Sequence, residues 1–231
     1  HWPWPRRHHA LLLDRLREAG AGTVFYDVDF SSPSSADDDR LLAEALARYA
    51  PGTVLLPAFS QPGNSLGAAA TITAVPLPPF RAHTLLAPVD MRPDRDGFVR
   101  RIPAARMIDG ELAVPAGARM SGHDALRESV IIDYAIDPRS FTRLSFADVL
   151  AGNFDPALLR GRQVAVGATA LELGDLLPVP VYRSLPGVVV QALAYETLRA
   201  GPLRTSHATA APAVTLLLFA VMAAVFRRSG W

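Results

Sequence analysis

Asp27 and Asp29 are the residues of this sequence whose type and spacing most directly allow chemistry. They close an apolar segment with strand character, residues 23–30, and side chains two positions apart in a strand point to the same face. Carboxylates at the carboxyl end of a strand in an α/β sheet lie where ligands commonly bind. The pair therefore has two interpretations: it binds a ligand or ion, or it caps the turn or helix that follows.

An enzymatic alternative is a magnesium-dependent phosphohydrolase built on Asp27 and Asp29, as in haloacid-dehalogenase-like phosphatases with their Asp-x-Asp motif. That family also needs a downstream basic residue, usually lysine, and a late acidic pair. The 23 basic residues here are all arginine, and no acidic pair stands at a suitable strand end. The sequence favours the other interpretations.

Two further candidates for a ligand pocket follow strands. Thr169 lies in the segment Gly-Ala-Thr-Ala at 167–170, which could approach a phosphate with its backbone amides but lacks the full glycine fingerprint of nucleotide sites. A cap of a following helix is the structural alternative for Thr169. Asp175 could join Asp27 and Asp29 at the same edge of the sheet.

Asp96 is the last candidate and lies in the segment Asp-Arg-Asp-Gly at 94–97. An EF-hand alignment of this segment fails, because Arg92 would occupy the first ligand position and Pro103 the position of the bidentate glutamate. Asp-Gly between two apolar runs instead predicts a hairpin turn, since glycine readily adopts the positive φ that such turns need.

Other kinds of chemistry find little support in the composition. The absence of cysteine excludes disulfides, thiolate zinc sites and a catalytic thiol. None of the six histidines has metal-ligand spacing, and His8 and His9, beside Arg6 and Arg7, are expected at the surface. With 23 basic and 22 acidic residues, nothing indicates nucleic-acid binding. We predict no cofactor, no metal and no catalytic residue.

The elements that must position these residues alternate between strand and helix character, which predicts an α/β fold: one three-layer domain with a mixed sheet flanked by helices. Ser34 or Ser35 is expected to cap the helix that begins with Asp37, Asp38 and Asp39. Predicted helices cover 8–19, the segment after Ser35, and 187–200; predicted strands cover 23–30, 53–59, 85–90, 98–107, 129–136 and 163–167.

The C-terminal region carries a run of nineteen uncharged residues, 208–226, followed by Arg227 and Arg228. A bilayer core of about 30 Å needs about 20 helical residues, and flanking arginines favour the cytoplasmic side. The run therefore predicts a transmembrane helix, with residues 1–205 as an extracytoplasmic domain and residues 206–231 as the start of the transmembrane region. A buried C-terminal helix of a soluble domain is the alternative.

Several segments, in order, resemble the type-two CHASE sensor domain (cyclases/histidine kinases associated sensory extracellular). Each is weak alone, whereas their order and spacing over residues 2–200, before an apolar run, are specific. Two departures are the missing strand before Trp2 and the polar stretch 121–127. The matching segments are Trp-Pro-Trp-Pro-Arg (2–6), Leu-Arg-Glu-Ala-Gly-Ala (16–21), Val-Phe-Tyr-Asp-Val-Asp-Phe (24–30), Asp-Arg-Asp-Gly-Phe-Val-Arg-Arg (94–101), Ser-Phe-Ala-Asp-Val-Leu-Ala-Gly (145–152), Leu-Arg-Gly-Arg-Gln-Val-Ala-Val-Gly-Ala-Thr-Ala (159–170), Asp175 with Pro178 and Pro180, and Pro-Gly-Val-Val-Val-Gln-Ala (186–192).

The resemblance implies a periplasmic sensor anchored in the inner membrane of a bacterium, part of a longer protein that forms a homodimer through its membrane helices. It implies an unidentified small-molecule or ion ligand and a cytoplasmic output module, with a diguanylate cyclase or cyclic-di-GMP phosphodiesterase preferred over an adenylate cyclase or a kinase. The chain itself is expected not to be an enzyme. Asp27, Asp29, Asp96, Thr169 and Asp175 are the predicted ligand-binding residues.

Overall fold

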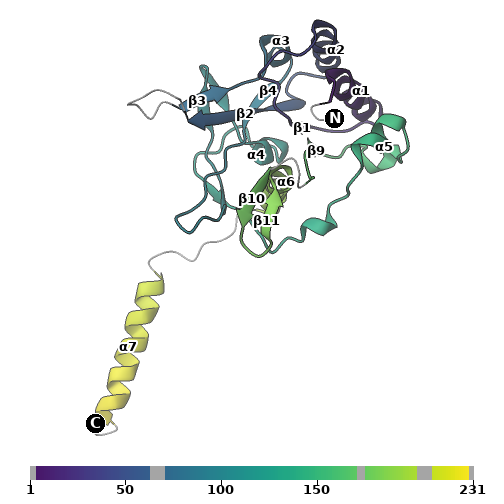
Figure 1. Cartoon of the computed structure of the whole chain (residues 1–231). Helices are drawn as coiled ribbons and strands as arrows, with labels where there is room; N and C mark the ends of the chain where they lie inside the picture. The colour runs from purple at the N-terminus through teal and green to yellow at the C-terminus, as the bar shows by residue number, and fades with distance from the viewer. Residues whose placement is uncertain (1–3, 63–70, 171–174, 202–209, 229–231) are drawn as a thin grey trace. The chain divides into compact units, whose positions relative to one another are not determined.

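The structure, a computed structural model, describes residues 4–62, 71–170, 175–201 and 210–228 (Figure 1). Side chains are described outside 60–72 and 210–213. The chain divides into two compact units, His1–Gly201 and Pro202–Trp231.

The first unit is built on a five-stranded mixed sheet. Four of its strands are parallel, in the order β4-β2-β1-β9, and a fifth strand pairs antiparallel with the end of β2. The parallel strands read as short apolar runs, as expected for strands covered on both faces. Their bounds are β1 Val24–Asp27, β2 Val54–Pro62, β3 Thr71–Ala74, β4 Leu85–Pro88 and β9 Val164–Gly167.

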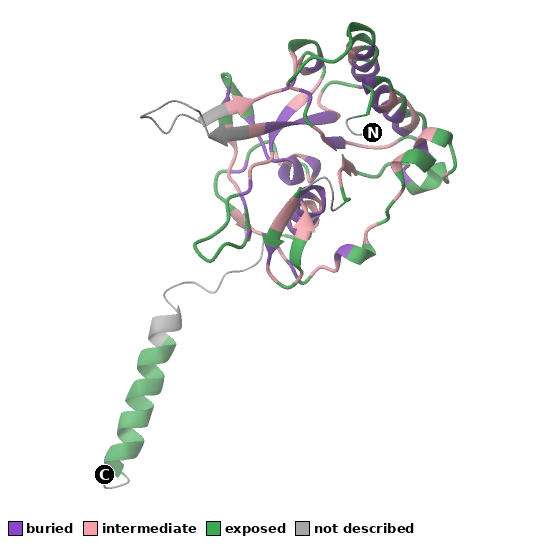
Figure 2. Cartoon of the chain, viewed as in Figure 1, coloured by how far each residue is buried: buried purple, intermediate pink, exposed green. Residues whose placement is uncertain are grey.

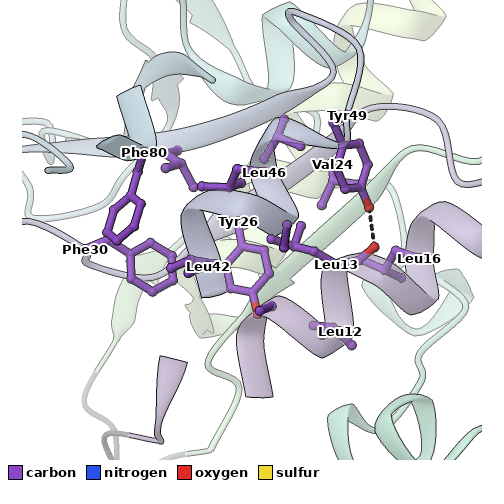
Figure 3. Close-up of a cluster of buried hydrophobic side chains, with 14 of the residues drawn as sticks. Leu12, Leu13, Leu16, Val24, Tyr26, Phe30, Leu42, Leu46, Tyr49 and Phe80 are labelled. Atoms are coloured by element: carbon purple, nitrogen blue, oxygen red, sulfur yellow. Dashed lines mark hydrogen bonds between the residues drawn. The ribbon is translucent and has the colours of Figure 1, made fainter. Parts of the chain in front are cut away.

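Helices cover both faces of this sheet because its strands alternate their apolar side chains. Val24 and Tyr26 point toward α1 (Arg6–Glu18) and α2 (Ala36–Ala47), where they join Leu13 and Leu42 in one buried cluster (Figure 3). Tyr49 closes this cluster by donating its hydroxyl hydrogen to the carbonyl oxygen of Leu13 at 2.6 Å.

The opposite face of the sheet is covered by α4 (Ala116–Met120) and α6 (Gly187–Ala200). Phe25, Leu55 and Ala87 pack there against Met120, with Tyr195 of α6 at the margin of the cluster. The result is a three-layer arrangement in which the sheet is the middle layer (Figure 1). The prediction of an α/β fold with a mixed sheet between helices is confirmed.

Shorter elements complete the first unit, and the burial pattern in Figure 2 places its core around the sheet and between α6 and the small ribbons. Three two-stranded antiparallel ribbons are present: β5 (Arg101–Ile102) with β8 (Val130–Ile131), β6 (Arg106–Ile108) with β7 (Glu111–Ala113), and β10 (Leu176–Val179) with β11 (Arg183–Pro186). The remaining helices are α3 (Pro78–Arg81), α5 (Phe146–Ala151) and the 3-10 turns Pro138–Ser140 and Pro156–Leu158.

The segment 94–97 forms the predicted turn but not the predicted hairpin. The Gly97 amide donates to the carbonyl oxygen of Asp94 at 2.9 Å, and Gly97 adopts a φ of +85°. The flanking strands, however, pair elsewhere: β4 pairs with β2 and β5 with β8. Strand partners are chosen by distant packing, which the local Asp-Gly signal does not contain.

The predicted cap of α2 is confirmed, whereas two predicted strands are shorter in the structure. Ser35 caps α2 as expected, since its hydroxyl accepts a hydrogen bond from the Asp38 amide at 3.2 Å. The predicted strand 23–30 ends at Asp27, and only Val130–Ile131 of the predicted strand 129–136 is extended in a ribbon. The early end of β1 leaves Asp29 in the following loop.

In the second unit, the structure describes the helix α7 (Ala210–Arg228). Its described side chains are exposed, among them Leu216, Leu217 and Phe219 at 71, 65 and 65 % of their full accessible area (Figure 2). In the part of the chain that the structure describes, no helix meets the length and apolar character needed to cross a membrane. The prediction of a transmembrane helix is therefore not confirmed.

Candidate functional site at the carboxyl edge of the sheet

The carboxyl ends of β1 and β9 form a topological switch point. The chain leaves β1 toward α2 on one face of the sheet, and it leaves β9 through β10 and β11 toward α6 on the other face. Asp27 and Gly167 are the last residues of these neighbouring strands and are partners in the sheet register. Open α/β sheets bind ligands outside the carboxyl ends of strands at such a point.

Gly167 allows α6 to lie directly against this edge. A β-carbon at Gly167 would stand 2.7 Å from the Val188 β-carbon and 3.1 Å from the Asp27 β-carbon. A larger residue would therefore separate the first turn of α6 from the strand ends. The absence of a side chain at Gly167 brings Val188 and the partly buried Asp27 together.

Asp175 reaches the same place from the start of β10. Its two carboxylate oxygens stand 2.7 and 2.8 Å from the position that a β-carbon would take at Gly187, the first residue of α6. The Gly187 amide also donates to the carbonyl oxygen of Asp175 at 3.1 Å. Because α6 has no side-chain cap of its own, Asp175 supplies the negative charge that favours a helix N-terminus.

The electrostatics of the edge are those of two carboxylates without a basic partner. Burial, and secondly the negative charge of Asp175, raise the pKa of Asp27 to about 7. Burial also raises the pKa of Asp175, against the lowering effect of the Gly187 amide. Among the described residues neither carboxylate belongs to an ion pair. A pair of carboxylates of this kind lowers its electrostatic energy when one of the two binds a proton.

The other predicted ligand residues lie apart from this pair or make different contacts. Asp29 is exposed beyond the end of β1, and its carboxylate accepts a hydrogen bond from the Ser31 amide at 2.8 Å, as a turn cap does. Asp96 is exposed and holds Arg100 through two contacts of 2.6 Å. Thr169 is exposed after β9. The predicted helix start that Thr169 would cap falls on residues 171–174, outside the described residues.

The described part of the edge offers a metal ion few ligands. Within the described ranges, no group of three or more histidine, aspartate, glutamate or cysteine side chains is placed to hold a metal ion. Oxygen-rich sites for magnesium or calcium use several carboxylates and carbonyls in a defined geometry. Asp27 and Asp175 alone are suited to a proton or to a positively charged or hydrogen-bonding ligand.

His9 is a polar residue that the sequence-based prediction placed incorrectly at the surface. Only 3 % of it is exposed, and its Nδ1 lies 2.8 Å from the Tyr26 hydroxyl. Burial, followed by the charges of His8 and Arg6, lowers the pKa of His9 to about 4. The spacing of His9 with Leu12, a residue of the buried stripe of α1, was the signal available in the sequence.

Arg6 is a second buried polar residue that the sequence-based prediction missed. Its guanidinium group contacts the Asp39 carboxylate and the Ser32 carbonyl oxygen, and it lies 5.4 and 5.2 Å from the ring centres of Phe30 and Phe80. These contacts join α1, α2 and the loop that follows β1. Arg6 thereby fixes the loop that leaves the candidate site.

The comparisons with known proteins decide the family. The sequence model of the CHASE2 domain matches residues 1–226, almost the whole chain. The chain belongs to the CHASE2 domain family. CHASE2 domains are extracellular sensor domains of signalling proteins, and they are sensory rather than catalytic. Neither the search of curated proteins nor the search of solved structures gives a match.

Proposed function

We propose that this CHASE2 domain is the periplasmic sensing part of a membrane-bound bacterial signalling protein, and that its signal enters at the edge formed by Asp27 and Asp175. The family match supports the sensory role. The position of both carboxylates at the switch point of the sheet, against the start of α6, carries the assignment of the site.

The membrane location rests on residues 208–226 and on α7. This run carries no charge and ends at Arg227 and Arg228, the side that the positive-inside rule places in the cytoplasm. The described side chains of α7 are apolar over most of its length and exposed, and apolar surface of that extent requires lipid or another protein as a partner. We infer that lipid is that partner and that two copies pair through their membrane helices.

The connection between site and membrane is α6. Its first turn contacts Gly167 and Asp175, and its last residue, Ala200, is followed after Gly201 by the second unit. We take α6 to have two positions relative to the sheet. A ligand that binds one of them more tightly shifts the equilibrium between them, and the size of this shift is limited by the difference in its affinity for the two positions. The length and polarity of the 202–209 segment then matter for transmission.

The output that we propose is cyclic-di-GMP synthesis or breakdown by a cytoplasmic module. This choice rests on the resemblance of residues 2–6 and 186–192 to CHASE sensors linked to cyclic-di-GMP turnover. In the full-length protein, Asp27→Asn and Asp175→Asn are expected to change the output, whereas Glu18→Gln, at an exposed glutamate at the end of α1, is expected to leave it unchanged.

The rival function, a magnesium-dependent phosphohydrolase built on Asp27, is tested with the same chain. We expect no magnesium heat signal in calorimetry and no hydrolysis of p-nitrophenyl phosphate above the level of the Asp27→Ala variant. The reason is that the described edge offers two carboxylates rather than a metal cage. Hydrolysis by the wild type that disappears in Asp27→Ala would replace the sensor by an enzyme.

A further inference from the structure

The described part of the sheet edge brings together acidic groups without a compensating positive charge. Among the described residues packed around Asp27, Asp175 is the charged neighbour that acts on it: β9 ends in Val166 and Gly167, and the first turns of α6 carry no ionisable side chain. On α4, Arg119 pairs with the exposed Asp124. Partial burial and mutual repulsion make the state in which both carboxylates are ionised unfavourable in free energy.

Gln191 of α6 is a second buried polar residue whose hydrogen bonding is incomplete. Only 2 % of Gln191 is exposed, and its side-chain oxygen is buried without a hydrogen-bond partner. Val188, three residues before it, lies against the strand end at Gly167, and Tyr195, four residues after it, borders the same buried cluster as Ala165 of β9.

The direction of α6 turns Gln191 toward the same edge. Val188 lies at the last residue of β9, whereas Tyr195 borders the cluster that contains Phe25, the register partner of Ala165 two residues earlier in β9. We infer from these two positions that α6 runs antiparallel to β9. Helical side chains lean toward the start of their helix, here toward the carboxyl ends of the strands. A buried acceptor without a partner destabilises the folded state. A protonated carboxyl group supplies a donor, and an ionised one does not.

We propose that Asp27 and Asp175 together bind one proton and that its release loosens the first turns of α6 from the sheet, so that the ligand of this sensor is the proton concentration outside the cell. This assignment of the ligand rests on the proposed function of the edge as the sensing site. The periplasm follows the external pH, and α6 leads directly to the second unit.

The sign of the effect follows from the direction of the shift. The pKa of Asp27 in the folded protein, about 7, is above the ordinary value of 3.8. Between these values the folded state binds the proton and the unfolded state does not, so the stabilisation is complete at low pH and is lost as the pH rises through about 7. The packing of α6 is therefore tightest in acid and weakest above neutrality.

The experiment is hydrogen–deuterium exchange of the whole chain in lipid nanodiscs, read by mass spectrometry over residues 187–200 from pH 5 to pH 9 after correction for intrinsic rates. We expect protection to fall with a midpoint near pH 7 in the wild type. Asp27→Asn is expected to remove the transition. Asp175→Asn is expected to move the midpoint to lower pH, because one of the two causes of the raised pKa is gone. Glu18→Gln is the matched control, since it removes an exposed carboxylate at the end of α1, the helix that leads into the amino end of β1. It is expected to leave the wild-type transition unchanged.

Three outcomes would overturn the proton assignment: the same protection profile in the wild type and in Asp27→Asn, a midpoint unaffected by Asp175→Asn, or a response to added magnesium or calcium at constant pH in place of the response to pH. If Asp27→Asn fails to fold, the test is the midpoint of the transition in Asp175→Asn, because Asp175 is exposed and its replacement disturbs the core less. The proton assignment can fail while Asp27→Asn and Asp175→Asn still alter the output. In that case the proposed sensing site stands, and only the identity of its ligand changes. Unchanged output in both variants would instead remove the site.

Discussion

Replacement of Arg6 by alanine is expected to lower the free energy of unfolding by about 3–5 kcal/mol. Arg6 is 7 % exposed, and its guanidinium group contacts Asp39, the Ser32 carbonyl oxygen and two aromatic rings. Its removal leaves the largely buried Asp39 carboxylate without its cation and opens a space beside Phe30. The measurement is urea-induced unfolding of the whole chain in detergent, followed by circular dichroism.

Two variants make this prediction specific to burial rather than to charge. Arg40→Ala removes an arginine of α2 that pairs with Glu44 at 2.7 Å, with both side chains about half exposed, and is expected to cost about 0.3–0.5 kcal/mol. Arg6→Lys keeps the charge but loses the planar contacts with the rings, so its effect is expected to be intermediate. Equal losses for Arg6→Ala and Arg40→Ala would contradict the account of Arg6 as the link between α1, α2 and the loop.

Gly117→Ala is expected to destabilise the protein by about 2–3 kcal/mol, although alanine is the better helix former. A β-carbon at Gly117 would stand 2.8 Å from the Ala194 β-carbon and 2.8 Å from the Tyr195 backbone nitrogen. Backbone atoms of α6 cannot move away as a flexible side chain can, so α4 and α6 must separate. Thermal unfolding of wild type and variant gives the difference.

The control for Gly117 is a glycine with free space around it. Gly110 has a φ of +84° and nothing within 4 Å of a β-carbon, so Gly110→Ala should cost only its backbone strain, about 1 kcal/mol. In addition, Ala194→Gly is expected to restore part of the loss in Gly117→Ala by removing one of the two contacts. A Gly117→Ala variant as stable as the wild type would show that α4 and α6 are not in close contact.

The sequence predicted the elements whose signals are local. The amphipathic spacing of α1, the serine cap and acidic first turn of α2, and the Pro-Gly start and Gly201 end of α6 all lie within single segments. The positive φ of Gly97 was predictable in the same way. The local Asp-Gly turn did not contain the choice of partner for the strands on either side of it, because that choice depends on residues 28 or more positions away.

The sequence predicted which residues could form the candidate site but not which of them lie together in the fold. The principle that ligands bind at carboxyl strand ends pointed to Asp27, and it left open whether Asp175 belonged to the same edge. That proximity depends on Gly167 and Gly187, which allow the start of α6 to approach the sheet. Gln191 gave no signal, because a glutamine within an apolar helix is uninformative until its surroundings are known.

The central claim is that the folded unit lies outside the cell and that residues after 226 lie inside. These 231 residues contain no cysteine, so a single cysteine introduced into them is their one thiol, and any cysteine in the remainder of the full-length protein is first replaced by serine. Ser34→Cys, in the exposed loop before α2, and Ser229→Cys, just beyond the two arginines, are compared in intact cells that produce the full-length protein. With a membrane-impermeant maleimide, the account predicts labelling of Ser34→Cys alone, and of Ser229→Cys only after the cells are opened. Labelling of Ser229→Cys from outside, with Ser34→Cys protected until lysis, would contradict it.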